Sequence, residues 1–179
     1  MKSSFLLFSL ILFLSCKTSK TEVEHLKENE ITLFYDTGEV KNIGVIDAFY
    51  KEYNNFRVGF WKEFYKNGKL KSEGNYKLDT YKQCCVSGFC DGYYSYKYGE
   101  WKYYHENGKL KAKGTYRIGK KHKKTSCEGG DEINFGYVTN NWKFYDVDGN
   151  EIKPSEKDIL EIENSSYLDE FEMSKYLNN

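Results

Sequence analysis

Four cysteines in the middle of the chain have the types and spacing for two kinds of chemistry. Cys84, Cys85 and Cys90 lie close together, and Cys127 follows after a gap. Such a set can form two disulfides or bind zinc through four thiolates, but zinc ligands usually come in closely spaced pairs and Cys127 stands alone. The spacing therefore favours disulfides over zinc, with free thiols as a further alternative. A bond between neighbours would be strained, which leaves Cys84–Cys90 with Cys85–Cys127, or Cys84–Cys127 with Cys85–Cys90.

The histidines and carboxylates form no recognisable catalytic set. His25, His105 and His122 are far apart, and no serine or cysteine nucleophile stands in a known motif near them. The run Asp146-Val-Asp-Gly-Asn-Glu151 begins like a calcium-binding loop, but its glycine comes too early, so the pattern predicts a hairpin turn. We therefore expect a non-enzymatic protein without a metal or a cofactor.

A strongly basic run is formed by Lys120, Lys121, Lys123 and Lys124. Residues 97–124 contain ten lysines and arginines against two acids, with tyrosine and tryptophan between them. This composition is compatible with nucleic-acid binding, but the exported location inferred below argues against that partner. We interpret the run as a solvated loop that offers a contact surface to anionic lipid, an acidic glycan or an acidic protein.

The first residues predict export and a lipid anchor. A short basic start precedes the apolar run at residues 5–14, which is too short to cross a bilayer and has the length of a signal-peptide core. The sequence Phe13-Leu-Ser-Cys16 resembles the lipobox of bacterial lipoproteins, although leucine is usual where Phe13 stands. The resemblance implies a signal peptide at residues 1–15 and lipidation of Cys16. Residues 16–30 are then a polar tether. The alternative is an ordinary secretory peptide with an incidental cysteine.

Composition indicates β structure in the rest of the chain. Of the 179 residues 18% are aromatic, and 27 basic residues balance 27 acidic ones. The aromatic content argues against disorder, and the balance excludes a uniformly polyanionic or polycationic chain. Tyrosine, phenylalanine and glycine are abundant while alanine is rare, which disfavours a helical bundle. The length suits one domain with tails.

An internal repeat organises the aromatic residues. Residues 59–76 return as residues 99–116 at an offset of 40, a shorter copy follows at 141–152, and a fainter one precedes them at 33–44. Such self-similarity is typical of a repeat architecture, whose core and turns we expect at the aligned positions. These positions are Trp61, Trp101 and Trp142; Phe34, Phe64, Tyr104 and Tyr145; Leu70 and Leu110; and Gly38, Gly44, Gly68, Gly74, Gly108, Gly114 and Gly149.

Each unit is predicted to be a β-hairpin. Asn67-Gly68 and its copy in the next unit are strong hairpin-turn signals, because both residue types tolerate positive φ. A three-residue loop would put Phe64 opposite Leu70, whereas a two-residue loop would put Trp61 opposite Gly74. We prefer the first register because the aromatic–aliphatic pair recurs. The hairpins then form an antiparallel meander, with longer loops on its other edge.

These longer loops are expected at residues 83–92 and 117–135, close enough for the cysteines to meet. The repeat pattern W-K-x-Y-Y-x-N-G-K-L-K-x-x-G-x-Y resembles the bacterial variant of the MORN-repeat family over residues 31–153, in four units. Its departures are a longer period, Ile31 where the other units have tryptophan, and Ser155 in place of the last glycine. The resemblance implies an all-β, elongated, single-layer antiparallel sheet that acts as a scaffold or contact surface and has no catalytic residues.

An acidic helical tail is predicted at residues 154–179, which contain seven acids and two lysines. Ser155 and Ser166 suit helix N-caps, since each has an acid three residues later. We expect a short helix that caps the open end of the sheet or frays.

The sequence favours one function over one alternative. The first hypothesis is a monomeric, lipid-anchored binding or scaffold module of the cell envelope, facing the periplasm or the exterior, which holds a protein or an envelope polymer. The alternative is an antitoxin or immunity protein that masks a toxin, because many bacterial members of the resembled family are catalogued as antitoxin-like.

Overall fold

A computed structural model describes residues 30–47, 56–165 and 167–169. The predicted signal peptide, Cys16, His25 and Ser166 lie outside the described residues. The elements are β1 (Glu30–Phe34), β2 (Val40–Ile46), β3 (Arg57–Phe64), β4 (Leu70–Cys85), β5 (Gly88–Tyr104), β6 (Leu110–Lys123), β7 (Asp131–Tyr137), β8 (Lys143–Tyr145), β9 (Glu151–Ile152), α2 (Glu156–Asn164) and β10 (Tyr167–Asp169).

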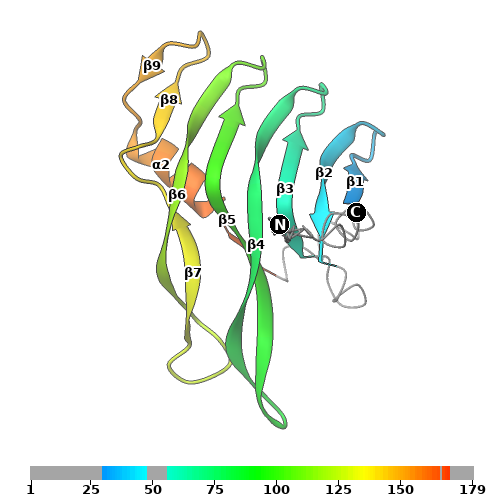
Figure 1. Ribbon diagram of the computed structural model, residues 1–179, viewed down its shortest axis with the longest axis vertical. Helices are drawn as coiled ribbons and strands as arrows, with labels where there is room; N and C mark the ends of the chain where they lie inside the picture. Colours follow the sequence, from blue (N-terminus) through cyan, green and yellow to red (C-terminus); the bar gives the residue numbers. More distant parts are fainter. Residues whose placement is uncertain (1–29, 48–55, 166, 170–179) are drawn as a thin grey trace, which may run out of the picture.

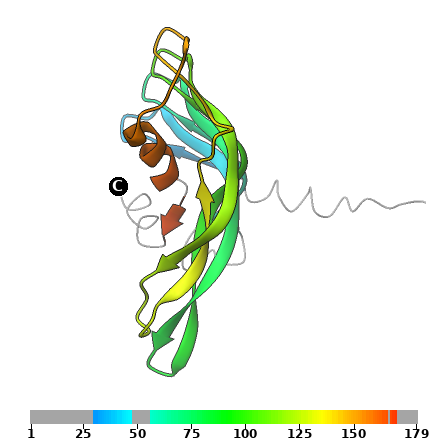
Figure 2. The same cartoon turned by 90° about the vertical axis from the view of Figure 1, so that its left-hand side faces the viewer.

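The strands form one open antiparallel sheet, which confirms the predicted all-β meander with a short C-terminal helix. Strands neighbour one another in the order β1-β2-β3-β4-β5-β6-β8-β9, while β7 pairs with β6 and β10 pairs with β5. The hairpin turns of the repeat units lie together at one end of the sheet, at the top of Figure 1. Seen edge-on in Figure 2, the sheet is curved, and α2 lies on its concave side.

The two registers considered for the central hairpin occur together. Phe64 lies opposite Leu70, and Trp61 lies opposite Gly74. Both pairs form because β4 has one extra residue, Lys71, at a β-bulge between them. The same shift occurs in the β5/β6 hairpin, so the bulge belongs to the repeat.

Neighbouring turns are hydrogen-bonded to each other. Gly68 has φ of 77°, as the left-handed position of the turn requires. The hydroxyl of Tyr65 donates to the carbonyl of Tyr104 at 2.7 Å, and the side-chain amide of Asn67 donates to the carbonyl of Glu106 at 3.0 Å. Each turn therefore positions the next one along the sheet.

The prediction of long loops at residues 83–92 and 117–135 is wrong. Most of the first range belongs to β4 and β5, which stay paired down to Cys85 opposite Gly88. Most of the second belongs to β6 and β7, which pair from Arg117 to Lys123. Both hairpin ends lie at the bottom of Figure 1, opposite the repeat turns, as the meander required.

The repeat units are interlocked by tryptophan rings that cover glycines of the preceding unit. A Cβ atom on Gly44, Gly74 or Gly114 would come within 2.1, 2.3 or 2.4 Å of the ring of Trp61, Trp101 or Trp142, respectively. Each indole N–H also donates to a backbone carbonyl just beyond its glycine; the acceptor for Trp101 is Asn75, at 3.1 Å. Only glycine leaves room for this approach, which explains why the two positions recur together.

The core is a row of rings on the concave face. Trp61, Tyr76, Trp101, Tyr116 and Trp142 follow one another with centroid distances of 4.9 to 6.3 Å, mostly edge to face. All five side chains are buried. Such edge-to-face pairs typically contribute about 0.5–1.5 kcal/mol each beyond the area they bury.

The aromatic position before each turn is not the buried core that the sequence predicted. Phe34 is 57% exposed, and Phe64, Tyr104 and Tyr145 are only half-buried, as are Leu70 and Leu110. These side chains lie close to the turn end of the sheet, where no second layer covers them among the described residues. Tyr76, Tyr103 and Tyr116 occupy the core in their place.

Helix α2 packs against the concave face instead of capping an open edge. Its N-cap is Ser155, whose side chain and Asp158 form a capping box, which confirms the predicted start. Ile162 is buried in the aromatic core, and its carbonyl accepts a hydrogen bond from the hydroxyl of Tyr116 at 2.9 Å. The side chain of Lys111 pairs with Glu161 at 2.7 Å.

Candidate functional site

The concave face has a polar part at β2, β3 and β4. The guanidinium of Arg57, whose side chain is only 5% exposed, donates to Glu63 at 2.6 Å. Glu63 also accepts from the hydroxyl of Ser72 at 3.1 Å. Arg57 lies over the ring of Trp61, 4.4 Å from its centroid. A buried cation, its counter-ion and an aromatic platform are thus assembled on one face.

Lys97 occupies the position of Arg57 in the next repeat unit, without a carboxylate partner at ion-pair distance among the described residues. It is 3% exposed and lies 4.2 Å from the ring centroid of Trp101. Its ammonium donates to the hydroxyl of Tyr103 at 3.1 Å and to that of Ser165, just after α2, at 3.3 Å. The repeat therefore places a cation on its own tryptophan twice.

These buried charges shift one another's pKa values. Burial alone would raise the pKa of Glu63, but Lys97 and Arg57 outweigh it and hold that pKa at about 2. Burial lowers the pKa of Lys97 to about 8, although Glu63 opposes the shift. Burial also raises the pKa of Tyr103 well above its usual value. At neutral pH this face thus has an ionised carboxylate between two cations.

A small hollow opens beside Arg57 and Glu63. Its volume is about 90 Å³, and Lys41, Asn42 and Lys71 complete its polar lining. Asn42 is buried and Lys71 is exposed, so the hollow runs from the sheet to solvent. It can accommodate a small polar group, whereas no arrangement of a nucleophile with a general base is present among its lining residues.

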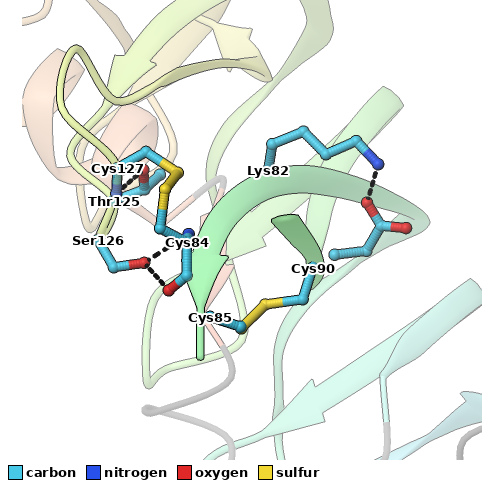
Figure 3. The surroundings of a disulfide bond; sticks show 8 residues. Lys82, Cys84, Cys85, Cys90, Thr125, Ser126 and Cys127 are labelled. Carbon is cyan, nitrogen blue, oxygen red and sulfur yellow. Dashed lines mark hydrogen bonds and ion pairs between the residues drawn. A yellow bond between two sulfur atoms is a disulfide. The ribbon is translucent and has the colours of Figure 1, made fainter. Parts of the chain in front are cut away.

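The extended hairpin ends are tied together by the cysteines. Cys84 is bonded to Cys127, which joins β4 to the loop after β6, and Cys85 is bonded to Cys90 across the β4/β5 hairpin (Figure 3). Ser126 supports the first bridge, since its hydroxyl donates to the carbonyl of Cys84 at 2.8 Å and accepts from its N–H at 2.7 Å. This is the second of the two pairings that the sequence left open.

Further polar contacts join the same two hairpins. The side-chain amide of Asn134, in β7, donates to the carboxylate of Asp79, in β4, at 2.5 Å. The backbone N–H of Asn134 donates to the hydroxyl of Tyr94 at 2.7 Å. Asp131 accepts the N–H of Lys82 at 2.6 Å. The hairpins therefore form one unit beyond the repeat core.

Two apolar side chains project from the tip of this unit. Val86 is fully exposed and Phe89 is 79% exposed. Val86 is in the turn itself and Phe89 follows it in β5, and both lie within the segment that the Cys85–Cys90 bond closes. The nearby ion pair between Lys82 and Asp91 leaves the charges beside the tip neutralised (Figure 3). Aromatic side chains are enriched in protein–protein interfaces, which makes the tip a candidate contact surface.

The predicted basic run lies on the neighbouring hairpin, in strand structure and not in a loop. Lys120, Lys121 and Lys123 belong to β6, and Lys124 follows directly. Lys120, Lys121 and Lys124 are exposed, and the ammonium of Lys121 lies over the ring of Phe135, 4.2 Å from its centroid. Lys123 is half-buried and lies over the ring of Tyr81, 4.6 Å from its centroid. Three of the four lysines can thus meet a partner at this end of the molecule.

The other residues singled out in the sequence have structural roles. A ring nitrogen of His105 is hydrogen-bonded to the carbonyl of Tyr145 at 2.9 Å, which links two turns. The carboxylate of Asp146 accepts N–H groups of Asp148 and Asn150, both at 2.9 Å, which confirms the hairpin turn. Among the described residues, no three histidine, cysteine or acidic side chains come together as metal ligands would.

Sequence reasoning missed Arg57, Glu63 and Lys97. One signal was available in the sequence. Arg57 and Lys97 align at the repeat offset of 40, and each stands four residues before the tryptophan of its repeat unit. When a basic residue recurs at the same position of two repeat units, it can be expected to contact the aromatic core.

The comparisons with known proteins support the repeat assignment. A family model described as the MORN repeat variant matches residues 57–78 and 97–117, which cover most of the β3/β4 hairpin and the adjoining parts of β5 and β6. No curated protein and no solved structure matches the chain. MORN repeats are binding modules without catalytic residues and often occur in membrane-associated proteins. None of the helices among the described residues has the length and apolar character needed to span a bilayer.

Proposed function

We propose that this protein is a non-enzymatic binding module of the cell envelope, anchored to a membrane through lipidated Cys16. The observation that carries the binding role is the cross-linked tip with exposed Val86 and Phe89. The Cys85–Cys90 bond restrains the backbone that carries both side chains, so less backbone entropy is lost when they enter a partner's pocket. The interlocked repeat units supply the rigid support that such a contact needs.

The partner is proposed to be a protein or an envelope polymer that meets the tip and the neighbouring lysines. Lys120, Lys121 and Lys124 add positive charge beside an apolar knob, so a complementary surface has an apolar pocket with acidic groups at its rim. At the tip itself, Lys82 is paired with Asp91 and adds no net charge. We therefore propose that Val86 and Phe89 enter a pocket on a partner and do not insert into an anionic membrane.

Capture from native envelopes tests the binding role. The double variant Val86→Ser, Phe89→Ser is compared with Val147→Ser, which removes an exposed apolar side chain (57% exposed) from a turn at the opposite end. Cross-linking should recover the same partner with the wild type and Val147→Ser and lose it with the double variant. A partner retained equally by all three proteins would exclude the tip as the contact.

Membrane fractionation tests the anchor separately. Cys16→Ser should move the protein from the membrane to the soluble fraction, because two acyl chains are needed for stable attachment. Retention of this variant in the membrane would rule out lipidation of Cys16.

The antitoxin alternative also has a direct test. Deletion of this gene alone should be harmless if the protein is a binding module. Toxicity that disappears when a neighbouring gene is deleted as well would favour the antitoxin.

A further inference from the structure

The contact between α2 and the sheet shows that a lysine at the β-bulge of a repeat unit can pair with a carboxylate. Lys111 is the extra residue of the bulge in the β5/β6 hairpin, and its ammonium pairs with Glu161 of α2 at 2.7 Å on the concave face. One repeat unit earlier, Lys71 has the same place in the β3/β4 hairpin. Lys71 is exposed, and it has no ion pair among the described residues.

The hollow beside Lys71 has an excess of positive charge. Arg57 forms part of its wall, where its guanidinium is paired with Glu63. Arg57, Lys41 and Lys71 outnumber the single acid, Glu63, in the lining.

The side chains around the hollow differ from those under α2. Two positions recur in the repeat. Where α2 docks, the first holds Tyr103 and Phe144 and the second holds Ala112. At the hollow, the first holds Glu63 and the second holds Asn42 and Ser72. An amphipathic helix anchored by an isoleucine, as α2 is, would meet polar groups here. The polar lining of the hollow suits a carboxylate that is carried by a largely polar segment.

We propose that the hollow binds a side-chain carboxylate from an acidic segment of a partner protein, which pairs with Lys71 as Glu161 pairs with Lys111. The site is separate from the hairpin tip, so it stands or falls independently of the function proposed above. Binding occurs on the concave face, beside the docked helix.

The test titrates the full-length protein at low salt with a hexaglutamate peptide and follows tryptophan fluorescence, since Trp61 adjoins Arg57. Hexaglutamine is the neutral control peptide. Lys71→Gln should weaken hexaglutamate binding at least fivefold. Lys113→Gln is the matched control, because it removes the same charge from an exposed residue of β6 that strand alternation places on the opposite face. This variant should bind like the wild type.

Three results would overturn the proposal. The first is the absence of saturable hexaglutamate binding to the wild type. The second is an equal loss in Lys71→Gln and Lys113→Gln, which would show diffuse charge attraction. The third is tighter, Lys71-dependent binding of heparin than of hexaglutamate, which would assign the site to an anionic polysaccharide. The capture experiment at the tip has its own variants, so failure here leaves that result unchanged.

Discussion

The two halves of the concave face share a backbone and differ in the side chains placed on it. In the half formed by β5, β6 and β8, Tyr103, Ala112 and Phe144 make an apolar surface on which Ile162 of α2 is buried. In the half formed by β2, β3 and β4, Glu63 occupies the repeat position of Tyr103 and Phe144, while Asn42 and Ser72 occupy that of Ala112. They surround the ion pair with Arg57.

This difference separates what a repeat must keep from what it can vary. The tryptophan and glycine positions are present in both halves because they join neighbouring units, and no other residue fits beneath the ring. The position two residues after the tryptophan faces the same side but forms no such joint. It can therefore hold an apolar ring that docks a helix or a carboxylate that partners a cation.

Breaking the joint that both halves share should have one of the largest effects. Trp101→Ala removes a ring that is 1% exposed and uncovers Gly74 of the preceding unit. The expected loss in the free energy of unfolding is about 3–5 kcal/mol, measured by urea denaturation. Phe60→Ala, at an exposed position of β3, is the control and should change stability by less than about 0.5 kcal/mol. A small loss for Trp101→Ala would show that the units do not depend on the joint.

The polar half should respond strongly to loss of its acid. Glu63→Ala leaves the Arg57 cation buried without its counter-ion, and we expect a loss of about 3–5 kcal/mol. At the equivalent position in the apolar half, Tyr103→Phe removes a hydroxyl that is bonded to Lys97 and Tyr116, and should cost about 1–3 kcal/mol. Equal losses in the two variants would contradict the distinction between the halves.

The same acid should give the polar half a dependence on pH. Because the pKa of Glu63 is held at about 2, below its ordinary 4.5, the folded state binds fewer protons than the unfolded chain between these values. Its contribution is complete above pH 4.5 and is lost as the pH falls toward 2. Stability should thus decline less steeply in this window for Glu63→Ala than for the wild type. Parallel curves from urea denaturation at a series of pH values would refute this assignment.

The apolar half should lose its helix when the anchor is removed. Ile162→Ala is expected to cost about 2–4 kcal/mol and to increase hydrogen exchange in α2, because a buried side chain is removed from the core. Leu160→Ala, on the 47% exposed side of the same helix, should leave both quantities nearly unchanged. Similar effects of the two substitutions would mean that α2 is not held by Ile162.

The smallest effect should come from the bulge lysines. The side chains of Lys111 and Glu161 are 27% and 57% exposed, so their ion pair contributes about 0.5 kcal/mol at most and less in high salt. Lys111→Gln should show this loss, whereas Lys71→Gln should leave stability unchanged. A stability loss for Lys71→Gln would reveal an intramolecular role for that residue.

Several features of the fold follow from spacing alone. The recurrence of tryptophan and glycine at an offset of 40, with Asn-Gly between them, predicted the hairpins and their order along the sheet. The capping box at Ser155 was also predictable, because it depends on residues three apart. The strand character of residues 83–92 and 117–135 was missed, since glycines, cysteines and lysines weaken the strand pattern that pairing across the hairpins nevertheless supports.

Local residue patterns thus specify the hairpins and their turns, because each depends on a few residues at short, repeated separations. Folding alone determines the rest. Which glycine lies beneath which ring, which cysteine meets Cys127, and where α2 docks all depend on contacts between distant segments. The pairing of Arg57 with Glu63 beside Lys97 likewise arises only when two repeat units pack side by side and water is excluded from the face between them.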